Sequence, residues 1–151
     1  MAEAFEAVLF DLFGTLVDER GNALPGASEL LQSLPRNRWA IVTSCGRKLA
    51  LALIAHAGLP QPEVLVSSDD VPLTKPHPAC YLAAAQHFGN GPAQCLVVED
   101  SRPGIEAGKA AGMTVVAVAR AGGAYIQADR AVVSIAELQL EVQENGAIAL
   151  R

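Results

Sequence analysis

The chain has 151 residues, of which 51% are hydrophobic, so it can bury one sizeable core but hardly two. Its net charge of −5 argues against a nucleic-acid-binding surface, which needs a basic stripe. The apolar runs fall short of the roughly 18 residues that cross a membrane, and residues 1–6 are acidic, unlike a signal sequence. We therefore expect a cytoplasmic protein that binds neither nucleic acid nor membrane.

Three cysteines agree with a reducing compartment. Cys45, Cys80 and Cys95 are odd in number and lack the spacing of metal ligands, which argues against a disulfide framework or a zinc site. Cys80 and Cys95 fall in a helical and a strand pattern, and we expect them to be small buried apolar residues. We interpret Cys45, at a Gly turn, as a bystander thiol rather than a nucleophile.

Strand-like runs and helical patterns alternate along the chain, which predicts an α/β fold with a central parallel sheet covered by helices on both faces. The strand-like runs are Phe5–Asp11, Trp39–Thr43, Val64–Ser67, Cys95–Glu99 and Thr114–Ala119, with a weaker run at Arg130–Ser134. The helical patterns cover about Ala27–Leu34, Arg47–Ala57, Pro78–Phe88 and Pro103–Ala111. The runs are almost continuously apolar, as expected for strands buried on both faces.

Two further segments have the pattern of hairpins. Residues 18–22 read as a tight turn, which predicts a small flap at about 17–26. Asn145-Gly146 lies between short alternating runs and predicts a hairpin at about 138–150, which we interpret as an edge extension or an oligomer contact. We expect a single domain over residues 1–151 and a homodimer.

Polar side chains come at the ends of three apolar runs. Asp11 ends the first, Thr43 and Ser44 end the second, and Glu99 and Asp100 end the fourth. A buried carboxylate costs desolvation energy unless a cation or several donors meet it. Open α/β sheets bind ligands beyond the carboxyl ends of their strands. The sequence therefore places a ligand site at that edge.

A single lysine, Lys75, precedes Pro76-His77-Pro78 and the third helical pattern. With the strand-end residues it forms an ordered set that resembles the four motifs of the haloacid dehalogenase (HAD) superfamily of hydrolases: a nucleophilic Asp, a Thr or Ser, a Lys and an acidic pair. Residues 99–113 are especially similar to the phosphoglycolate and sugar-phosphate phosphatase branch. The resemblance covers about residues 5–135 and implies a three-layer, Rossmann-like HAD fold.

The resemblance also implies a metal-assisted attack on phosphorus. Asp11 would be the nucleophile and form an aspartyl phosphate that water hydrolyses. Mg²⁺ would be held by Asp11, by the backbone carbonyl of Phe13, by Asp100 and, through a bound water, by Glu99.

The remaining motif residues are expected to bind the phosphoryl group. Thr43, Ser44 and Lys75 would donate to its oxygens, and Asp11, Thr43 and Lys75 would form the catalytic set. The implied substrate is a small phosphorylated molecule or an exposed phosphoester of a larger one.

Phe13 departs from the phosphatase pattern. Phosphatases of this group carry there a second Asp, which protonates the leaving oxygen and activates water, and Phe13 can do neither. General acid–base catalysis is typically worth about 10²–10⁴ in rate. Sugar alkoxides should therefore leave slowly, whereas activated esters, acyl phosphates and aryl phosphates should suffer less.

The interval between the first two motifs is short. Only residues 17–38 lie there, where the phosphatase branch normally inserts a helical cap of several dozen residues. The sequence therefore predicts a capless member, whose site is open to solvent unless a neighbouring subunit covers it.

Three alternatives stay open at this point. The chain could be a non-catalytic phosphate- or phosphoprotein-binding module in which Phe13 marks lost chemistry. It could be a haloacid dehalogenase, because halide leaves without protonation, although the Glu99-Asp100 pair has the metal-binding form. It could also resemble phosphonate hydrolases, for which Lys48 or Lys109 would have to supply the Schiff-base lysine.

Overall fold

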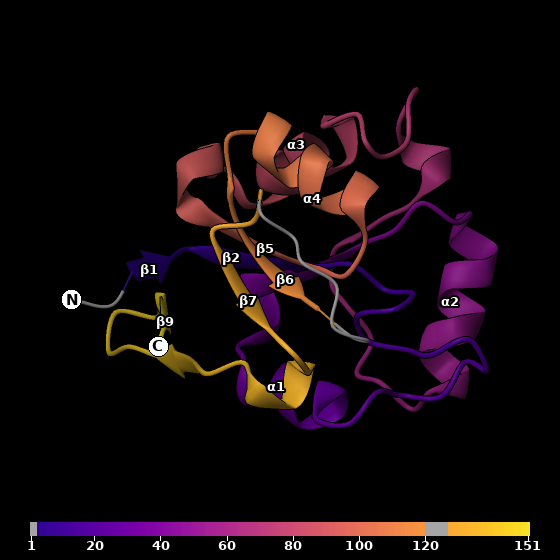
Figure 1. Ribbon diagram of the computed structural model, residues 1–151, viewed down its shortest axis with the longest axis horizontal. Helices are drawn as coiled ribbons and strands as arrows, with labels where there is room; N and C mark the ends of the chain where they lie inside the picture. Colours follow the sequence, from indigo (N-terminus) through magenta and orange to yellow (C-terminus); the bar gives the residue numbers. More distant parts are fainter. Residues whose placement is uncertain (1–2, 120–126) are drawn as a thin grey trace.

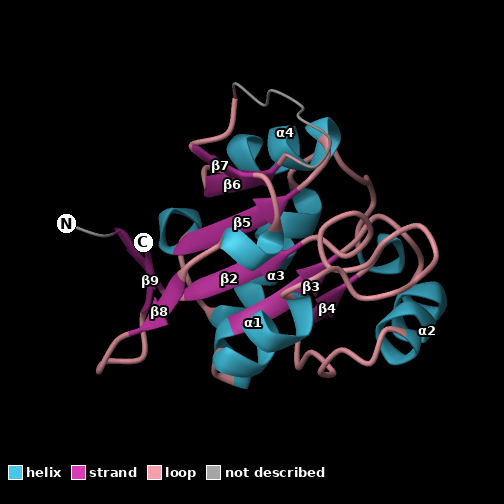
Figure 2. Cartoon of the chain, turned by 60° about the horizontal axis from the view of Figure 1, so that its bottom comes forward, coloured by secondary structure: helices cyan, strands magenta, loops and turns pink. Residues whose placement is uncertain are grey.

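The computed structural model describes residues 3–119 and 127–151, so the first two residues of the acidic N-terminal segment lie outside the described part. Six parallel strands form a central sheet in the order β4-β3-β2-β5-β6-β7. They are β2 (Ala7–Phe10), β3 (Trp39–Val42), β4 (Leu65–Val66), β5 (Cys95–Glu99), β6 (Thr114–Val118) and β7 (Arg130–Val132). The predicted α/β fold with a central parallel sheet is confirmed (Figures 1 and 2).

Helices cover both faces of this sheet. They are α1 (Ala27–Ser33), α2 (Arg47–His56), α3 (Ala79–Phe88) and α4 (Arg102–Ala110). In Figure 1, α3 and α4 lie above the sheet and α1 lies below it. Successive strand residues point to opposite faces, so Phe10 packs in the cluster that includes Leu31 of α1, and Leu9 packs in the cluster that includes Tyr81 of α3. The result is the expected three-layer arrangement.

The N-terminal strand differs from the prediction. One strand was expected from Phe5 to Asp11, but the chain breaks at Glu6, whose N–H donates to the carbonyl of Gln94 and whose carboxylate pairs with Arg38. Strand β1 (Glu3–Phe5) belongs instead to a second sheet, with the order β1-β9-β8. The single-strand prediction was therefore wrong, because an apolar pattern does not reveal which sheet a strand joins.

The second sheet contains the C-terminal hairpin. Strands β8 (Leu140–Val142) and β9 (Ile148–Leu150) pair antiparallel, and the turn between them holds Gly146 at a φ of 87°. Because β9 also pairs with β1, the hairpin does not extend an edge of the central sheet, contrary to one of the two interpretations. Figure 1 places β1 and β9 at the end of the molecule opposite α2.

The connection between β2 and α1 is short and lacks a cap. In this stretch, all of which the structure describes, Val17 forms isolated bridges with Phe13 and Ala23. The Asp18 carboxylate accepts hydrogen bonds from the backbone N–H groups of Arg20 and Asn22, at 2.9 and 3.0 Å, and closes the turn of the predicted flap. The single-domain assignment for residues 1–151 stays a prediction.

The structure also shows where two of the cysteines lie and how long and apolar the helices are. Cys80 and Cys95 are buried, as expected, and burial raises the pKa of both thiols, to about 11 for Cys95. Among residues 3–119 and 127–151, none of the helices has the length and hydropathy needed to span a bilayer.

Candidate active site

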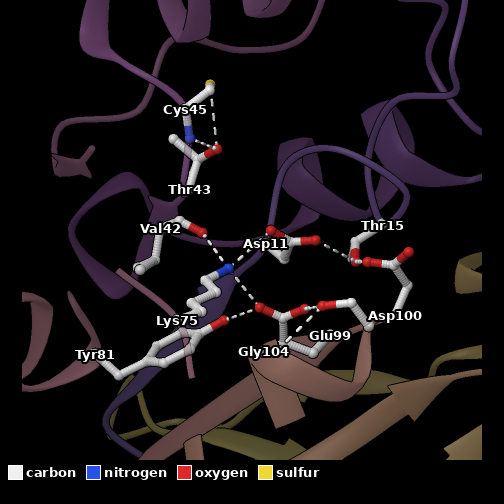
Figure 3. Close-up of polar contacts among 11 residues, drawn as sticks. Asp11, Thr15, Val42, Thr43, Cys45, Lys75, Tyr81, Glu99, Asp100 and Gly104 are labelled. Atoms are coloured by element: carbon white, nitrogen blue, oxygen red, sulfur yellow. Dashed lines mark hydrogen bonds and ion pairs between the residues drawn. The ribbon is translucent and has the colours of Figure 1, made fainter. Parts of the chain in front are cut away.

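The polar strand ends meet at one edge of the central sheet. Asp11 follows β2, Thr43 follows β3, and Glu99 is the last residue of β5. Since β2 lies between β3 and β5, their carboxyl ends bring these residues to the same place (Figure 3). Lys75 enters from the loop between β4 and α3, and its ammonium Nζ lies 2.8 Å from Asp11 Oδ1.

Three carboxylates form a compact cluster. Oxygen atoms of Asp11, Glu99 and Asp100 lie within 4.8 Å of one another. The hydroxyl of Thr15, which is fully buried, lies 3.2 Å from Asp11 Oδ2 and 3.2 Å from Asp100 Oδ1, and so joins two of the three. An all-oxygen donor set of this kind suits a hard divalent cation such as Mg²⁺.

The electrostatics of the cluster favour such a cation. Burial and then the charge of Asp11 raise the pKa of Glu99 to about 7, although Lys75 opposes this. Burial, a hydrogen bond with Asp11 and the Asp11 charge likewise raise the pKa of Asp100 to about 7. The crowded, desolvated carboxylates thus resist full ionisation, and a bound divalent ion would relieve their repulsion.

Lys75 is held by three acceptors. Its Nζ donates to Asp11 Oδ1, to the backbone carbonyl of Val42 at 3.0 Å, and to Glu99, with which it forms an ion pair. An ammonium group has three N–H donors, so each one is engaged. Burial lowers the pKa of Lys75, but Asp11 and Glu99 outweigh it and hold that pKa above its ordinary value. Lys75 is therefore a fixed positive charge at the centre of the acidic cluster.

Glu99 is the most enclosed member of the cluster. Its carboxylate accepts a 2.5 Å hydrogen bond from the hydroxyl of Tyr81 and a 3.3 Å bond from Ser101. Burial and the charge of Glu99 raise the pKa of Tyr81 well above its ordinary value, so the phenol stays a donor. A Cβ atom on Gly104 would overlap the Glu99 carboxyl group, so only glycine fits at this point of α4.

Gly14 has a comparable role beside Asp100. It has a φ of +89°, which side-chain-bearing residues rarely adopt, and a Cβ atom there would overlap the Asp100 carboxylate. The sequence reasoning missed the contributions of Thr15, Tyr81, Gly14 and Gly104. Gly14 carried a local signal as the turn directly after the first apolar run, although its contact with Asp100 was not predicted. Gly104 carried another, because a glycine in the first turn of a helix lowers helix propensity and needs a packing reason.

Thr43 and Ser44 follow β3 and line the same pocket as Asp11. Thr43 is buried, and its Oγ1 lies 3.3 Å from both the backbone nitrogen and the Sγ of Cys45 (Figure 3). Ser44 is exposed and, with Thr43, Lys75 and Asp11, lines a pocket of about 480 Å³. The structure thus brings the residues expected to bind a phosphoryl group to one cavity.

Phe13 also lines this cavity, and 51% of it is exposed. Within the described part of the chain, Asp11 is the only carboxylate in the pocket lining, which contains no histidine. The absence of an acid at position 13 is therefore not compensated by another acidic side chain of the lining.

Open parallel α/β sheets bind their ligands at the carboxyl ends of their strands, where this chain gathers three carboxylates and a lysine. Residues 19–112 match the family model described as hydrolase, haloacid dehalogenase-like hydrolase. The chain belongs to this family.

Two similar proteins have names that describe phosphate-ester hydrolysis. The chain is 48% identical over 98 residues to hexitol phosphatase A of Escherichia coli, an alignment that covers 64% of this chain and 45% of the relative. It is 36% identical over 111 residues to glycerol-1-phosphate phosphohydrolase 2 of Saccharomyces cerevisiae, covering 67% and 44%. The chain therefore spans less than half the length of these relatives.

Solved structures share the fold. A HAD family hydrolase from Deinococcus radiodurans, with bound phosphate and sodium, superposes with a TM-score of 0.81 at 26% identity, covering 88% of this chain and 93% of the other. CbbY from Rhodobacter sphaeroides, in complex with xylulose-(1,5)bisphosphate, gives a TM-score of 0.79 at 20% identity, covering 89% and 96%.

Proposed function

We propose that this chain is a phosphatase-type hydrolase in which Asp11 attacks the phosphorus of a phosphomonoester. A carboxylate oxygen of Asp11 forms a bond to phosphorus while the ester P–O bond breaks, and the leaving oxygen keeps the electron pair. Water then attacks phosphorus, the bond to Asp11 breaks, and inorganic phosphate is released. The observation that carries this proposal is the Asp11 carboxylate, which lines the pocket while Lys75 holds it at 2.8 Å.

The cation of this site is proposed to be Mg²⁺. Asp11, Asp100 and the backbone carbonyl of Phe13 would hold it, and Glu99 would act through water because its oxygens already accept bonds from Lys75, Tyr81 and Ser101. Three carboxylates against one ammonium leave the site negative, so an anionic substrate would be repelled. When bound, Mg²⁺ supplies the positive charge that offsets the phosphoryl oxygens.

Thr43, Ser44 and Lys75 are proposed to bind the phosphoryl group. Lys75 can exchange its contact with the Val42 carbonyl, a neutral acceptor, for a phosphoryl oxygen and keep its carboxylate partners. The Thr43 hydroxyl can donate to the same group when it turns from Cys45. These donors would stabilise the charge that develops on the equatorial oxygens in the transition state.

The relatives support a small phosphorylated molecule as the substrate, since their names refer to hexitol phosphate and glycerol-1-phosphate. The pocket volume of about 480 Å³ is in the range of small-ligand sites. A homodimer and a cytoplasmic location remain predictions from the sequence.

One observation favours a second candidate, a phosphate-binding module without turnover. Phe13 stands at the place of the second Asp of the resembled phosphatases, and no other carboxylate or histidine of the described lining replaces that acid. Such a module would bind phosphate with Mg²⁺ but would not release phosphate from an ester.

Hydrolysis of acetyl phosphate separates these two candidates, because its leaving group needs no protonation. We expect Mg²⁺-dependent release of phosphate that is lost in Asp11→Asn. Asp18→Asn is the matched control: it makes the same chemical change in the flap, and its amide oxygen can still accept the bonds from Arg20 and Asn22. Equal rates for the two variants would contradict the proposal, and calorimetric phosphate binding without turnover would favour the binding module.

A further inference from the structure

The pocket has two chemically different parts. Its polar part is formed by Asp11, Thr43, Ser44, Cys45, Thr74, Lys75 and Ser101. The proposed function assigns Asp11, Thr43, Ser44 and Lys75 to the phosphoryl group. The rest of the lining is apolar and consists of Phe13, Leu49, Leu53 and Pro103. The alcohol portion of a phosphomonoester held at Asp11 therefore has four apolar side chains to pack against in the same pocket.

The apolar part combines a strand-end loop with one face of a helix. Leu49 and Leu53 are four residues apart on α2 and therefore lie on the same side of that helix. Phe13 is 51% exposed and Leu49 is 55% exposed, so each leaves a large apolar surface in contact with water. Contiguous exposed apolar surface beside a functional cleft commonly marks a binding site for an apolar group.

A sugar alcohol would fit this lining poorly. Each hydroxyl group placed against Phe13, Leu49 or Leu53 would lose its water and gain no hydrogen-bond partner from these side chains, which weakens binding. An aromatic ring would bury its own surface and that of the lining. The same pocket thus favours an aromatic alcohol portion over a polyhydroxylated one.

The small number of proton donors in the pocket also favours an aromatic alcohol portion. Besides Asp11, the titratable side chains of the described lining are Lys75, whose three N–H groups are engaged, and Cys45, whose thiol contacts the Thr43 hydroxyl. Because the described lining holds no carboxyl group besides Asp11 and no imidazole, we expect the departing oxygen to leave as an anion. A phenolate is a far better leaving group than an alkoxide, since phenols ionise near a pKa of about 10.

We propose that the pocket selects aryl phosphates, monoesters of phosphate with a phenol, and this rests on the proposed phosphatase chemistry. The ring packs between Phe13 and the two α2 leucines while the phosphoryl group lies at Asp11. The bond from Asp11 to phosphorus forms as the P–O bond to the ring breaks, and the phenolate leaves with the electron pair and no proton. Water then hydrolyses the aspartyl phosphate, and its protons go to the released phosphate and to solvent.

Steady-state kinetics of two leucine variants tests this assignment. Leu49→Asn removes part of the apolar lining and should raise the KM for phenyl phosphate roughly 3- to 10-fold, the effect of losing part of one buried leucine. Leu51→Asn is the control, because Leu51 is 40% exposed on the same helix but lines a different cavity. Hydrolysis of acetyl phosphate, which has no ring, should be unchanged in the Leu51→Asn control.

The possible results separate a failure of the aryl assignment from a failure of the proposed phosphatase function. Normal hydrolysis of acetyl phosphate with identical KM values for phenyl phosphate in the two leucine variants would overturn the aryl assignment alone. So would a wild-type kcat/KM for glycerol phosphate that equals or exceeds that for phenyl phosphate. Absence of Mg²⁺- and Asp11-dependent hydrolysis of all three substrates would overturn the proposed function and this inference together.

Discussion

Phe13 lies two residues after Asp11 and lines the same pocket, at the position where the resembled phosphatases have a general acid. Replacing it with Asp would provide a proton for an alkoxide leaving group. We expect Phe13→Asp to raise kcat/KM for glycerol phosphate by about 10²–10⁴, the usual worth of general acid–base catalysis. The same variant should lose part of its preference for phenyl phosphate, because the ring no longer has Phe13 to pack on.

Phe13→Asn is the control for this prediction. It is nearly the same size as Asp and removes the same ring, but it has no proton to transfer. A similar rise in glycerol phosphate hydrolysis in the Asn and Asp variants, measured as released phosphate, would show that steric relief and not acid catalysis is responsible.

Gly104 is a second residue whose identity the site dictates. A Cβ atom there would overlap the buried Glu99 carboxyl group, so Gly104→Ala must displace either Glu99 or the start of α4. We expect a loss of about 1–3 kcal/mol in the free energy of unfolding, the usual cost of overpacking. Urea unfolding followed by fluorescence of Trp39, the only tryptophan and fully buried, measures this directly.

Gly91→Ala controls for the glycine change itself. Gly91 has a φ of −71°, and the nearest atom to an added Cβ would be Gln94 Oε1, at 3.8 Å. Its stability should stay within about 0.5 kcal/mol of the wild type, or rise slightly as the unfolded chain loses freedom. An equal loss in both variants would contradict the steric account of Gly104.

The small β1-β9-β8 sheet should contribute to stability but not to activity at the site. Ile148 of β9 is fully buried in the cluster shared with the central sheet, so Ile148→Ala should cost about 2–5 kcal/mol. Val142→Ala on β8, where 39% of the side chain is exposed, should cost much less. Figure 1 places this sheet opposite α2, so phosphate release per folded molecule should be unchanged in both variants. A fall in activity per folded molecule in either variant would show that this small sheet is coupled to the site.

Asp129 links α4 to β6 through hydrogen bonds that we expect to be sensitive to acid. Burial tends to raise its pKa, but hydrogen bonds from Lys109 at 2.9 Å and from the Val115 N–H at 2.8 Å outweigh it and lower that pKa below its ordinary value. A folded-state pKa below the unfolded one adds stability above pH 4 or so, and this is lost as the pH falls through the folded pKa.

Asp129→Asn should remove this dependence. Between about pH 5 and pH 3 the wild type should lose more of its free energy of unfolding than the variant, as measured by urea unfolding at each pH. Glu144→Gln, which changes an exposed carboxylate in the hairpin turn, should retain the wild-type slope. Parallel pH profiles for wild type and Asp129→Asn would refute the link.

For the whole molecule, the alternation of apolar runs and helical patterns predicted the layered fold, because central parallel strands are buried on both faces. The ends of these runs also indicated where Asp11, Thr43 and Glu99 would meet. The break at Glu6 was not predictable, since β1 pairs with β9, more than a hundred residues away in sequence. Nor was the Tyr81–Glu99 bond, which depends on how α3 packs on the central sheet.

The proposed chemistry requires Asp11 to share a phosphoryl group with a divalent ion held by the carboxylate cluster. Beryllofluoride, a mimic of the aspartyl phosphate, tests this most directly by isothermal titration calorimetry. We expect one-to-one binding that requires Mg²⁺, is lost in Asp11→Asn and is retained in Asp18→Asn. Binding of the same strength without Mg²⁺, or by the Asp11→Asn variant, would contradict the account.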